Sequence, residues 1–384
     1  MIFLEYTFGA LAALSCAILF WQWLAARQFP LHQKNAGPDF APAVSILKPI
    51  KGGDATTRES LQSWLRQNYA GPVEILFGIA DENDPAVAIV RALLAENPAA
   101  HARLVICQNL AGTNAKSAKL AQLEKLAQHD LILTCDADVR VPPDFLANFV
   151  PPLRAEKIAL VNCFYRLANP TTTAMRWEAV AVNADFWSQV LQSQTLKPLD
   201  FALGAALLVR RRALAQIGGF AAFADHLADD YQLGQRIVKN GHGIALCPVV
   251  VECWGAPMNW RQVWQHQLRW ARTIRVCQPL SYFFSILANA SLWPLLWLVI
   301  SLAAGKTFCA PLTAIVFLLG RMLFAQNLQR RFTPGGQLVS PAWLVPVKDW
   351  LAAAIWLAAF AGNTVEWRGT KLKLRRDGTL EKID

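Results

Sequence analysis

Long apolar stretches lie at the two ends of the chain and frame a middle of ordinary polarity. The first, residues 2–24, is almost wholly apolar, with Glu5 and Gln22 as exceptions, and is long enough to span a bilayer. It lacks the basic start and the small-residue cleavage signal of a secretory peptide, which predicts a retained anchor over residues 1–26. Basic residues follow this run and none precedes it: Arg27, His32 and Lys34. The asymmetry places the chain from residue 30 onward in the cytoplasm.

Near the C-terminus, three apolar stretches of spanning or near-spanning length cover residues 280–304, 307–324 and 341–361. They predict a membrane region over residues 279–365, followed by a basic tail over residues 366–384. Three spans would place this tail outside the cell, although its Lys and Arg content favours the cytoplasm. The alternative is that the last stretch is re-entrant or interfacial, because polar and helix-breaking residues interrupt it: Pro346, Lys348 and Asp349.

Between the membrane regions, residues 40–257 alternate short apolar runs with helical patterns. The runs at residues 44–49, 73–79, 103–107 and 131–135 read as strands, and the segments between them read as helices. This β-α-β-α-β-α-β series predicts an α/β domain with a parallel sheet and right-handed crossovers.

Two further segments are rich in aromatic residues. Residues 171–192 form a helical segment that is either a core helix or a surface that meets the membrane and admits a lipid. Residues 258–278 carry Trp and Arg on an amphipathic helix, which suits the headgroup layer of a bilayer. Arg269 and Trp270 on that helix could instead face inward, toward phosphates.

Composition supports a membrane protein. The hydrophobic fraction of 54% and the mean hydropathy of +0.26 are high for a soluble enzyme of 384 residues. The net charge of +10 lies largely beside the apolar ends, and no nucleic-acid module is visible, so we expect a membrane surface as partner and no nucleic acid. The 8 cysteines show no zinc spacing and favour a reducing compartment.

Candidate chemistry gathers where buried strands end. Asp136 and Asp138 follow the run at 131–135, and an acidic cluster that begins with Asp81 follows the run at 73–79. Open α/β sheets bind ligands at this edge. If the chain turns after Asp136, the two carboxylates can hold one Mg²⁺ or Mn²⁺, whose other oxygens come from a substrate diphosphate and water. The alternative is a loop-capping pair. No G-x-G-x-x-G or Walker A sequence occurs, which weakens an oxidoreductase or NTPase interpretation.

Several motifs occur in one collinear order over residues 43–275: LKPIKGGD, ADENDPA, GTNAK, CDADVRVPPDFL, and GAALLVRRRALAQIGGF followed by ADDYQLG. Together they resemble the ceramide glucosyltransferase family, and even more its bacterial relative, the hopanoid-associated glycosyltransferase. The resemblance implies a GT-A fold, a UDP-sugar donor, a divalent metal ion and inversion at the anomeric carbon.

The resemblance also implies roles for single residues. Asp81 would contact uridine, Asp136 and Asp138 would hold the metal ion, and Asp136 would also face the donor. Lys48 and Lys116, from the first and third motifs, would bind the donor. In the family's closing (Q/R)-x-x-R-W motif, Arg269 and Trp270 match, but His266 holds the first position. An imidazole can donate to a phosphate or stack, but it cannot form a guanidinium fork.

Asp230 falls on the family's general base. From the residues alone it is equally an N-cap, because Ala228-Asp229-Asp230 precedes a helical run. With two adjacent carboxylates, we expect Asp229 to cap the helix and Asp230 to act as the base. Like-charge proximity would raise the pKa of the free carboxylate, which suits that task.

The sequence thus predicts a multi-pass protein of the cell inner membrane with a cytoplasmic catalytic domain. It would move a hexose, glucose or N-acetylglucosamine, from a UDP-sugar to a hydroxyl of a membrane lipid of the ceramide or hopanoid type, with diacylglycerol also open. One alternative is a processive polysaccharide synthase. The other is a non-catalytic membrane scaffold that keeps the fold as a binding surface.

Overall fold

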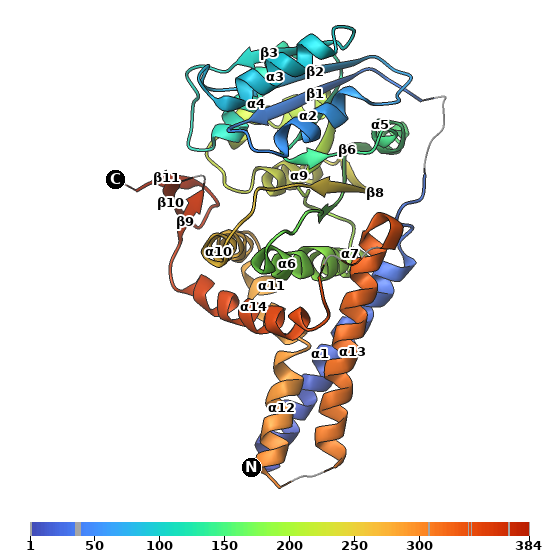
Figure 1. Ribbon diagram of the computed structural model, residues 1–384, viewed down its shortest axis with the longest axis vertical. Coiled ribbons are helices and arrows are strands. Elements are labelled where there is room, and N and C mark those ends of the chain that lie inside the picture. Colours follow the sequence, from blue (N-terminus) through green and yellow to red (C-terminus); the bar gives the residue numbers. More distant parts are fainter. Residues whose placement is uncertain are drawn as a thin grey trace.

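The computed structural model describes residues 2–34, 40–305, 308–336, 338, 340–367 and 369–383. An α/β body stands on a stalk of apolar helices, and a small sheet from the C-terminus packs against the side of the body (Figure 1).

The first half of the body has the predicted alternation of strands and helices. Its four strands are parallel, with Val44 of the first opposite Val73 and Leu131 in its two neighbours. The elements are β1 (Val44–Ile50), α2 (Thr57–Leu65), β2 (Val73–Ile79), α3 (Pro85–Glu96), β3 (Ala102–Ile106), α4 (Ala115–Leu126) and β4 (Leu131–Cys135).

The second half makes the sheet mixed, which corrects the prediction of a parallel sheet. β7 runs antiparallel to both β4 and β6, whereas β6 and β8 are parallel. The 8-stranded order is β3-β2-β1-β4-β7-β6-β8-β5. The added elements are β5 (Val139–Arg140), α5 (Phe145–Phe149), η1 (Pro151–Arg154), β6 (Ile158–Leu167), β7 (Ala206–Arg210), α8 (Arg211–Gln216), η3 (Phe220–Phe223), α9 (Asp229–Lys239) and β8 (Gly243–Cys253).

Apolar side chains fill both faces of the sheet. Along β1, Ile46 packs into the cluster on one face and Leu47 into the cluster on the other, and both are fully buried. A strand that is buried on both sides reads as a continuous apolar run, which is why these strands could be recognised in the sequence.

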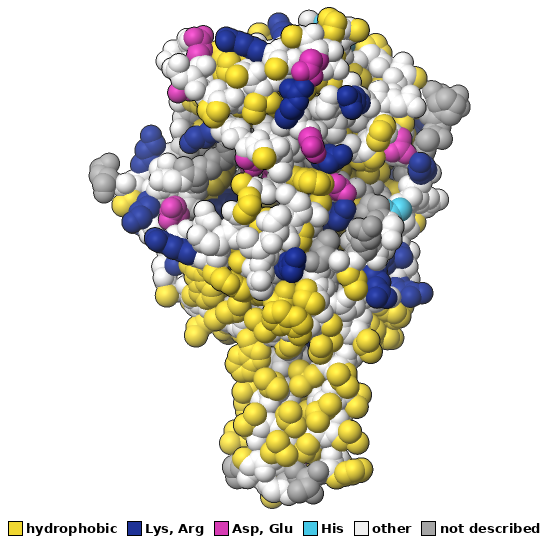
Figure 2. All heavy atoms as spheres, in the orientation of Figure 1, with side chains coloured by type: hydrophobic (Ala, Val, Ile, Leu, Met, Phe, Trp, Pro, Cys, Tyr) yellow, Lys and Arg dark blue, Asp and Glu magenta, His cyan; other side chains and the backbone are white. Residues whose placement is uncertain are grey.

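In the part of the chain that the structure describes, two helices of the stalk are candidates for crossing a membrane, and a bent pair of helices is a third if it counts as one span. α1 (Ile2–Gln28) and α13 (Cys309–Phe332) are each long and apolar enough. Between them, α11 (Pro279–Phe284) and η4 (Ser285–Ala288) form a pair with α12 (Leu292–Ala303) that is bent by 47° and could act as one further span. Figure 2 shows the stalk as an almost continuous apolar surface.

The last apolar stretch behaves differently. α14 (Leu344–Phe360) runs across the direction of α1 and α13, below the body, and buries Lys348 and Asp349 (Figure 1). It is not among the candidate spans. The tail that follows forms an antiparallel sheet against α10 (Trp260–Cys277), so it lies on the same side of the stalk as the body. Its strands are β9 (Thr364–Trp367), β10 (Thr370–Leu374) and β11 (Leu380–Lys382). The re-entrant or interfacial placement of this stretch stays a prediction, and either placement is consistent with a tail beside the body.

A helical floor separates the body from α14. It consists of α6 (Thr173–Val180), the π-helical turn η2 (Ala181–Phe186) and α7 (Trp187–Leu196). Trp177 and Trp187 of this floor are almost fully buried, as the core-helix interpretation of residues 171–192 requires.

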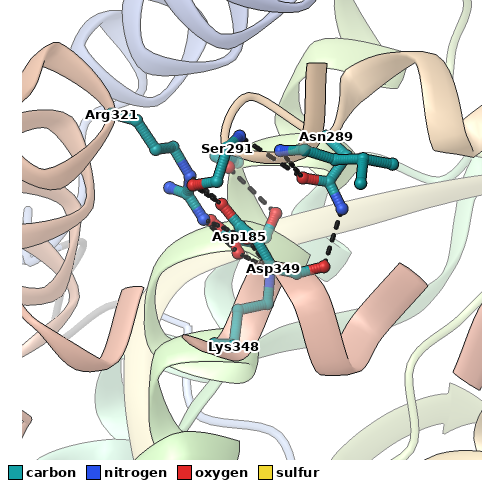
Figure 3. A network of polar contacts seen from close by, with 8 residues as sticks. Asp185, Asn289, Ser291, Arg321, Lys348 and Asp349 are labelled. Atoms are coloured by element: carbon teal, nitrogen blue, oxygen red, sulfur yellow. Dashed lines mark hydrogen bonds and ion pairs between the residues drawn. The ribbon is translucent and has the colours of Figure 1, made fainter. Parts of the chain in front are cut away.

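Buried charges join the floor, the stalk and α14 (Figure 3). The Arg321 guanidinium in α13 donates to both oxygens of Asp349, at 2.8 and 2.9 Å, and to Asp185 Oδ2 of η2 at 2.8 Å. Lys348 donates to the same two carboxylates, and Ser291 Oγ donates to Asp349 at 2.6 Å. The network is charge-balanced and links three elements that lie far apart in the sequence.

We predict that Arg321→Met lowers the free energy of unfolding by about 3 to 5 kcal/mol, because it leaves two buried carboxylates with one cation. Arg321→Met combined with Asp349→Leu should cost less than the single change, because Lys348 and Asp185 remain as a balanced pair. Reversible unfolding in mixed detergent micelles measures both, with exposed Arg91→Met as the control. A double variant less stable than Arg321→Met would contradict this account.

Candidate active site

The acidic tripeptide after β4 forms the predicted turn. The backbone N–H of Val139 donates to the carbonyl of Asp136 at 3.3 Å, and Trp254 N–H donates to the carbonyl of Asp138 at 3.0 Å. Both carboxylates therefore leave the same turn at the carboxyl end of a buried strand. Asp136 is partly exposed and Asp138 is exposed.

Lys116 joins Asp136 to the second acidic motif. Its ammonium lies 2.8 Å from Asp136 Oδ1 and 3.5 Å from Asp229 Oδ2. Burial opposes the positive charge, but the carboxylates of Asp136, Asp229 and Asp230 outweigh it and raise the pKa of Lys116 above its usual range. Lys116 therefore stays protonated in this setting.

The GTNAK motif fixes the position of Lys116. Asn114 caps α4 by accepting from the N–H groups of Lys116 and Ser117, and its side-chain amide donates to the carbonyl of His226 at 2.7 Å. Gly112 has a φ of +86°, and a Cβ there would lie 2.5 Å from the carbonyl oxygen of Ala224. The motif thus holds the segment that leads into α9 against the start of α4.

The structure corrects the helix cap that was expected of Asp229. The residue that precedes α9 is Ala228, and no side chain caps this helix. Asp229 instead faces Lys116 and accepts a long hydrogen bond from Ser117 Oγ at 3.4 Å. A sequence pattern cannot distinguish these partners, because the residues it pairs lie on α4 and α9.

Asp230 has the electrostatic setting of a base. Its Oδ1 accepts the N–H of Tyr231 at 2.7 Å. Burial, and then the neighbouring charge of Asp229, raise the pKa of Asp230 from 3.8 to about 6. A carboxylate with a pKa near the working pH can accept a proton and release it again.

Gly204 makes room for Asp230. A Cβ at this glycine would lie 2.7 Å from Asp230 Oδ2 and 3.2 Å from Asp230 Cβ. In addition, the N–H of Asp136 donates to the carbonyl of Ala205 at 3.1 Å. The Gly-Ala pair before β7 therefore lies between Asp136 and Asp230, and the space at Gly204 is occupied by a carboxylate.

Lys48 supports the site from below, which corrects its assignment to the donor surface. The side chain is fully buried, with its ammonium 4.7 Å from the centre of the Trp64 ring. It donates to the carbonyl of Asp136 at 2.9 Å and to Cys135 Sγ at 3.3 Å. Because its donors point at the end of β4, Lys48 holds the turn and does not reach the surface.

Asp81 lies at the same edge of the sheet, after β2, and its side chain is exposed. Its Oδ1 accepts the backbone N–H of Asn83 at 2.9 Å. Since β1 alone separates β2 from β4 in the sheet, the Asp81 and Asp136 loops flank the end of β1.

The residues of the closing motif face the floor and the tail. His266 Nδ1 lies 2.7 Å from Glu178 Oε1, and the His266 ring lies 4.5 Å from that of Trp270. The Arg269 guanidinium lies 5.9 Å from the centre of the Trp367 ring in β9. Glu178, which is fully buried, is a partner that the sequence did not reveal.

The tail was also missed as part of the site. Leu380 N–H donates to the carbonyl of Asp225 at 2.7 Å, and His226 forms an isolated bridge with Thr379. Leu227 packs into an apolar cluster with side chains from all three tail strands. The tail therefore holds the segment immediately before Asp229 in place through hydrogen bonds and apolar contacts. The short tail strands gave no clear signal in the sequence.

The turn after β4 suits a hard divalent cation. Asp136 and Asp138 offer only oxygen ligands, which Mg²⁺ and Mn²⁺ prefer. In the part of the chain that the structure describes, no group of three or more His, Cys, Asp or Glu residues could hold a metal ion. Such an ion would thus take its remaining ligands from substrate and water, as Mg²⁺ commonly does.

Comparisons with known proteins bear on the family and the fold of this chain. Ceramide glucosyltransferase 3 of Caenorhabditis elegans is 26% identical over 58% of this chain and 48% of that protein. Ceramide glucosyltransferase 1 of the same organism is 24% identical over 92% of this chain and 76% of that protein. The beta-monoglucosyldiacylglycerol synthase of Trichormus variabilis is 26% identical over 54% of this chain and 44% of that protein. The chain thus spans about half the length of the first and third relatives.

Among solved structures, a mannosyltransferase from Pyrobaculum calidifontis, in complex with GDP-Man and Mn²⁺, matches with a TM-score of 0.57 and 21% identity. The match covers 92% of this chain and 99% of that one, and it shows that the body has a GT-A-like fold. The model of glycosyl transferase family 21 matches residues 7–380, nearly the whole length. The chain therefore belongs to glycosyl transferase family 21.

Proposed function

We propose that this glycosyltransferase moves a hexose from a UDP-sugar to a hydroxyl of a membrane lipid, with inversion at the anomeric carbon. The names of its relatives favour glucose as the sugar, with N-acetylglucosamine as the alternative. They favour ceramide or diacylglycerol as the acceptor. A hopanoid acceptor rests on the sequence resemblance alone.

One observation carries the proposal. Lys116 connects Asp136, at the end of β4, to Asp229, beside Asp230 at the start of α9. Three motifs that lie far apart in the sequence thus meet at one edge of the sheet. A donor diphosphate beside Asp136 and an acceptor hydroxyl beside Asp230 would then be neighbours.

In the proposed reaction, Asp230 accepts the proton of the lipid hydroxyl as its oxygen attacks the anomeric carbon, and UDP departs from the opposite face. Lys116 contributes a fixed positive charge beside Asp136, where the diphosphate would bind. A divalent ion held by Asp136 and Asp138 would neutralise the charge that develops on the leaving diphosphate. Asp81 would contact the uridine, and Arg269 would support the leaving group.

The proposed location is the inner membrane, with the body in the cytoplasm where UDP-sugars are found. Arg27, Arg330 and Arg331 lie at the body-side ends of the two long candidate spans, as the positive-inside rule requires. α14 and the floor would lie at the bilayer surface, where a lipid hydroxyl is within reach.

The two alternatives have less support. A processive synthase needs a long translocation channel, whereas the described residues contain two candidate spans, or three if the bent pair is one. A scaffold has no need for a half-buried Asp230 whose pKa is raised, since such a group opposes folding when ionised. An assay of UDP release, with mass spectrometry of the product, distinguishes the three functions. UDP-glucose and UDP-N-acetylglucosamine are each tested against ceramide and diacylglycerol in nanodiscs. A protein that releases no UDP with any pair would contradict the proposal.

We predict that kcat/KM for the lipid acceptor decreases when the pH is lowered through about 6. Below that pH Asp230 is protonated and cannot accept the hydroxyl proton. Asp230→Asn should lower the transfer rate by roughly 100-fold or more and leave UDP-sugar affinity nearly intact. Transfer rates across a pH series and calorimetry of donor binding measure the two effects.

The matched variant is Asp229→Asn. It removes the like charge beside Asp230 and should therefore move the acid limb to lower pH while transfer at neutral pH persists. Transfer that survives in Asp230→Asn but not in Asp229→Asn would show that the roles are exchanged.

We also predict that transfer requires a divalent ion held by Asp136 and Asp138. Asp136→Asn or Asp138→Asn keeps the side-chain shape but removes charge, so the apparent affinity for Mg²⁺ or Mn²⁺ should fall and kcat should drop by roughly 100-fold or more. Titration of the metal ion at saturating donor measures this effect. Undiminished turnover of Asp138→Asn would leave Asp136 as the sole metal carboxylate, and full activity in excess chelator would exclude the metal.

Gly204→Ala tests the placement of the base. The added methyl group would displace the Asp230 carboxylate, and a displacement of about 1 Å can cost on the order of 100-fold in rate. We expect kcat to fall while donor affinity and thermal stability change little. Gly320→Ala is the control, because a Cβ there meets open space. Normal kcat in Gly204→Ala would show that the position of Asp230 is not critical.

A further inference from the structure

A basic pocket lies at the body-side ends of the two long candidate spans. It is lined by Arg27 from α1 and by Asn327, Arg330 and Arg331 from α13, and its volume is about 260 Å³. It shares no lining residue with the candidate active site. Figure 2 shows Lys and Arg side chains gathered at the level where the apolar stalk meets the body.

The charge of this pocket is not balanced by the protein. Among the described residues, no carboxylate forms an ion pair with Arg27, Arg330 or Arg331. Arg321, on the same helix as Arg330 and Arg331, differs from them because it forms ion pairs with Asp185 and Asp349. Guanidinium groups held close together repel one another, so the arrangement favours an anion between them.

Hydrogen bonds between α1 and α13 hold the lining of the pocket in place. Arg331 donates to the carbonyls of Ala26 and Arg27, at 2.6 and 3.1 Å, and to that of Phe29, and so it satisfies the last turn of α1. Trp23 Nε1 donates to Asn327 Oδ1 at 2.9 Å. These bonds fix α1 against α13 and leave Arg27 and Arg330 as the exposed cations of the site.

The surroundings of the pocket match the headgroup layer of a bilayer. Arg27 lies 5.2 Å from the centre of the Trp23 ring, and Trp23 packs against Phe20 and Phe324 at 5.7 and 5.1 Å. Below this aromatic cluster the exposed large side chains of both helices are apolar, and Arg321 is buried. Trp beside basic residues at the end of a span is the usual composition of the membrane interface.

We propose that this pocket binds the phosphate of an anionic phospholipid. Guanidinium groups pair with phosphate through parallel charge-assisted hydrogen bonds, and basic pockets between spans bind anionic headgroups. Such a lipid would hold α1 and α13 together at the bilayer surface. The effect would reach the body, because the N–H of His32, shortly after α1, donates to the carbonyl of Pro248 in β8 at 2.8 Å.

The test uses the full chain in a zwitterionic detergent. Dioleoyl phosphatidylglycerol should raise the melting temperature by binding the folded state, whereas dioleoyl phosphatidylcholine should not. Arg27→Gln and Arg330→Gln should each weaken the apparent affinity for phosphatidylglycerol by about fivefold, and the double variant should weaken it by roughly 25-fold.

Arg261→Gln on the amphipathic α10 and Arg91→Gln on α3 are the matched controls, since each removes one exposed positive charge elsewhere. The proposal requires both controls to keep the wild-type affinity. It is overturned if Arg261→Gln weakens the lipid effect as much as Arg330→Gln, which would indicate diffuse surface charge. It is also overturned if inorganic phosphate stabilises the protein as well as phosphatidylglycerol does. The test needs no glycosyl transfer, so its outcome is independent of the proposed function.

Discussion

The contact between Arg321 and the two carboxylates of Asp185 and Asp349 is the constraint on which the architecture depends. Charges buried at this depth are costly unless they meet partners, so these ion pairs favour the observed arrangement of α13, α14 and η2. That arrangement turns α14 across the stalk instead of letting it continue as a span. The tail strands follow α14 directly, and they return to the body for this reason.

The returned tail then acts on the catalytic region. Its strands bind the segment from Asp225 to Leu227, and Asn114 of the GTNAK motif holds the same segment from the other side. Because Asp229 follows two residues later, its distance to Lys116 depends on contacts with the C-terminal tail and with the GTNAK motif. The position of the proposed base therefore depends on packing against the tail that follows α14.

The sequence alone predicted those features of the structure that are determined by a few neighbouring residues. The strand before Asp136 and the turn that follows it could be predicted, because an apolar run and a Pro-Pro stop encode them within a few residues. The burial of Lys48 could not, because its partners come from other elements. The cap assigned to Asp229 was wrong because Lys116 competes for that carboxylate from another helix. The orientation of α14 across the stalk could not be predicted, because it depends on the ion pair between Asp349 and Arg321. Arg321 lies on a different helix, and the sequence pattern does not show which carboxylate it meets.

The charges of the candidate site predict how a metal ion and the donor would affect each other's binding. The carboxylates of Asp136, Asp229 and Asp230 lie around the ammonium of Lys116, and Asp138 adds a further carboxylate on the same turn as Asp136. A nucleotide diphosphate that approached this edge alone would meet an excess of negative charge. A divalent ion held by Asp136 and Asp138 would offset this charge, and Lys116 would then be available to the phosphates while Asp136 remained paired. Metal and donor are thus expected to bind with positive coupling, each increasing the affinity for the other.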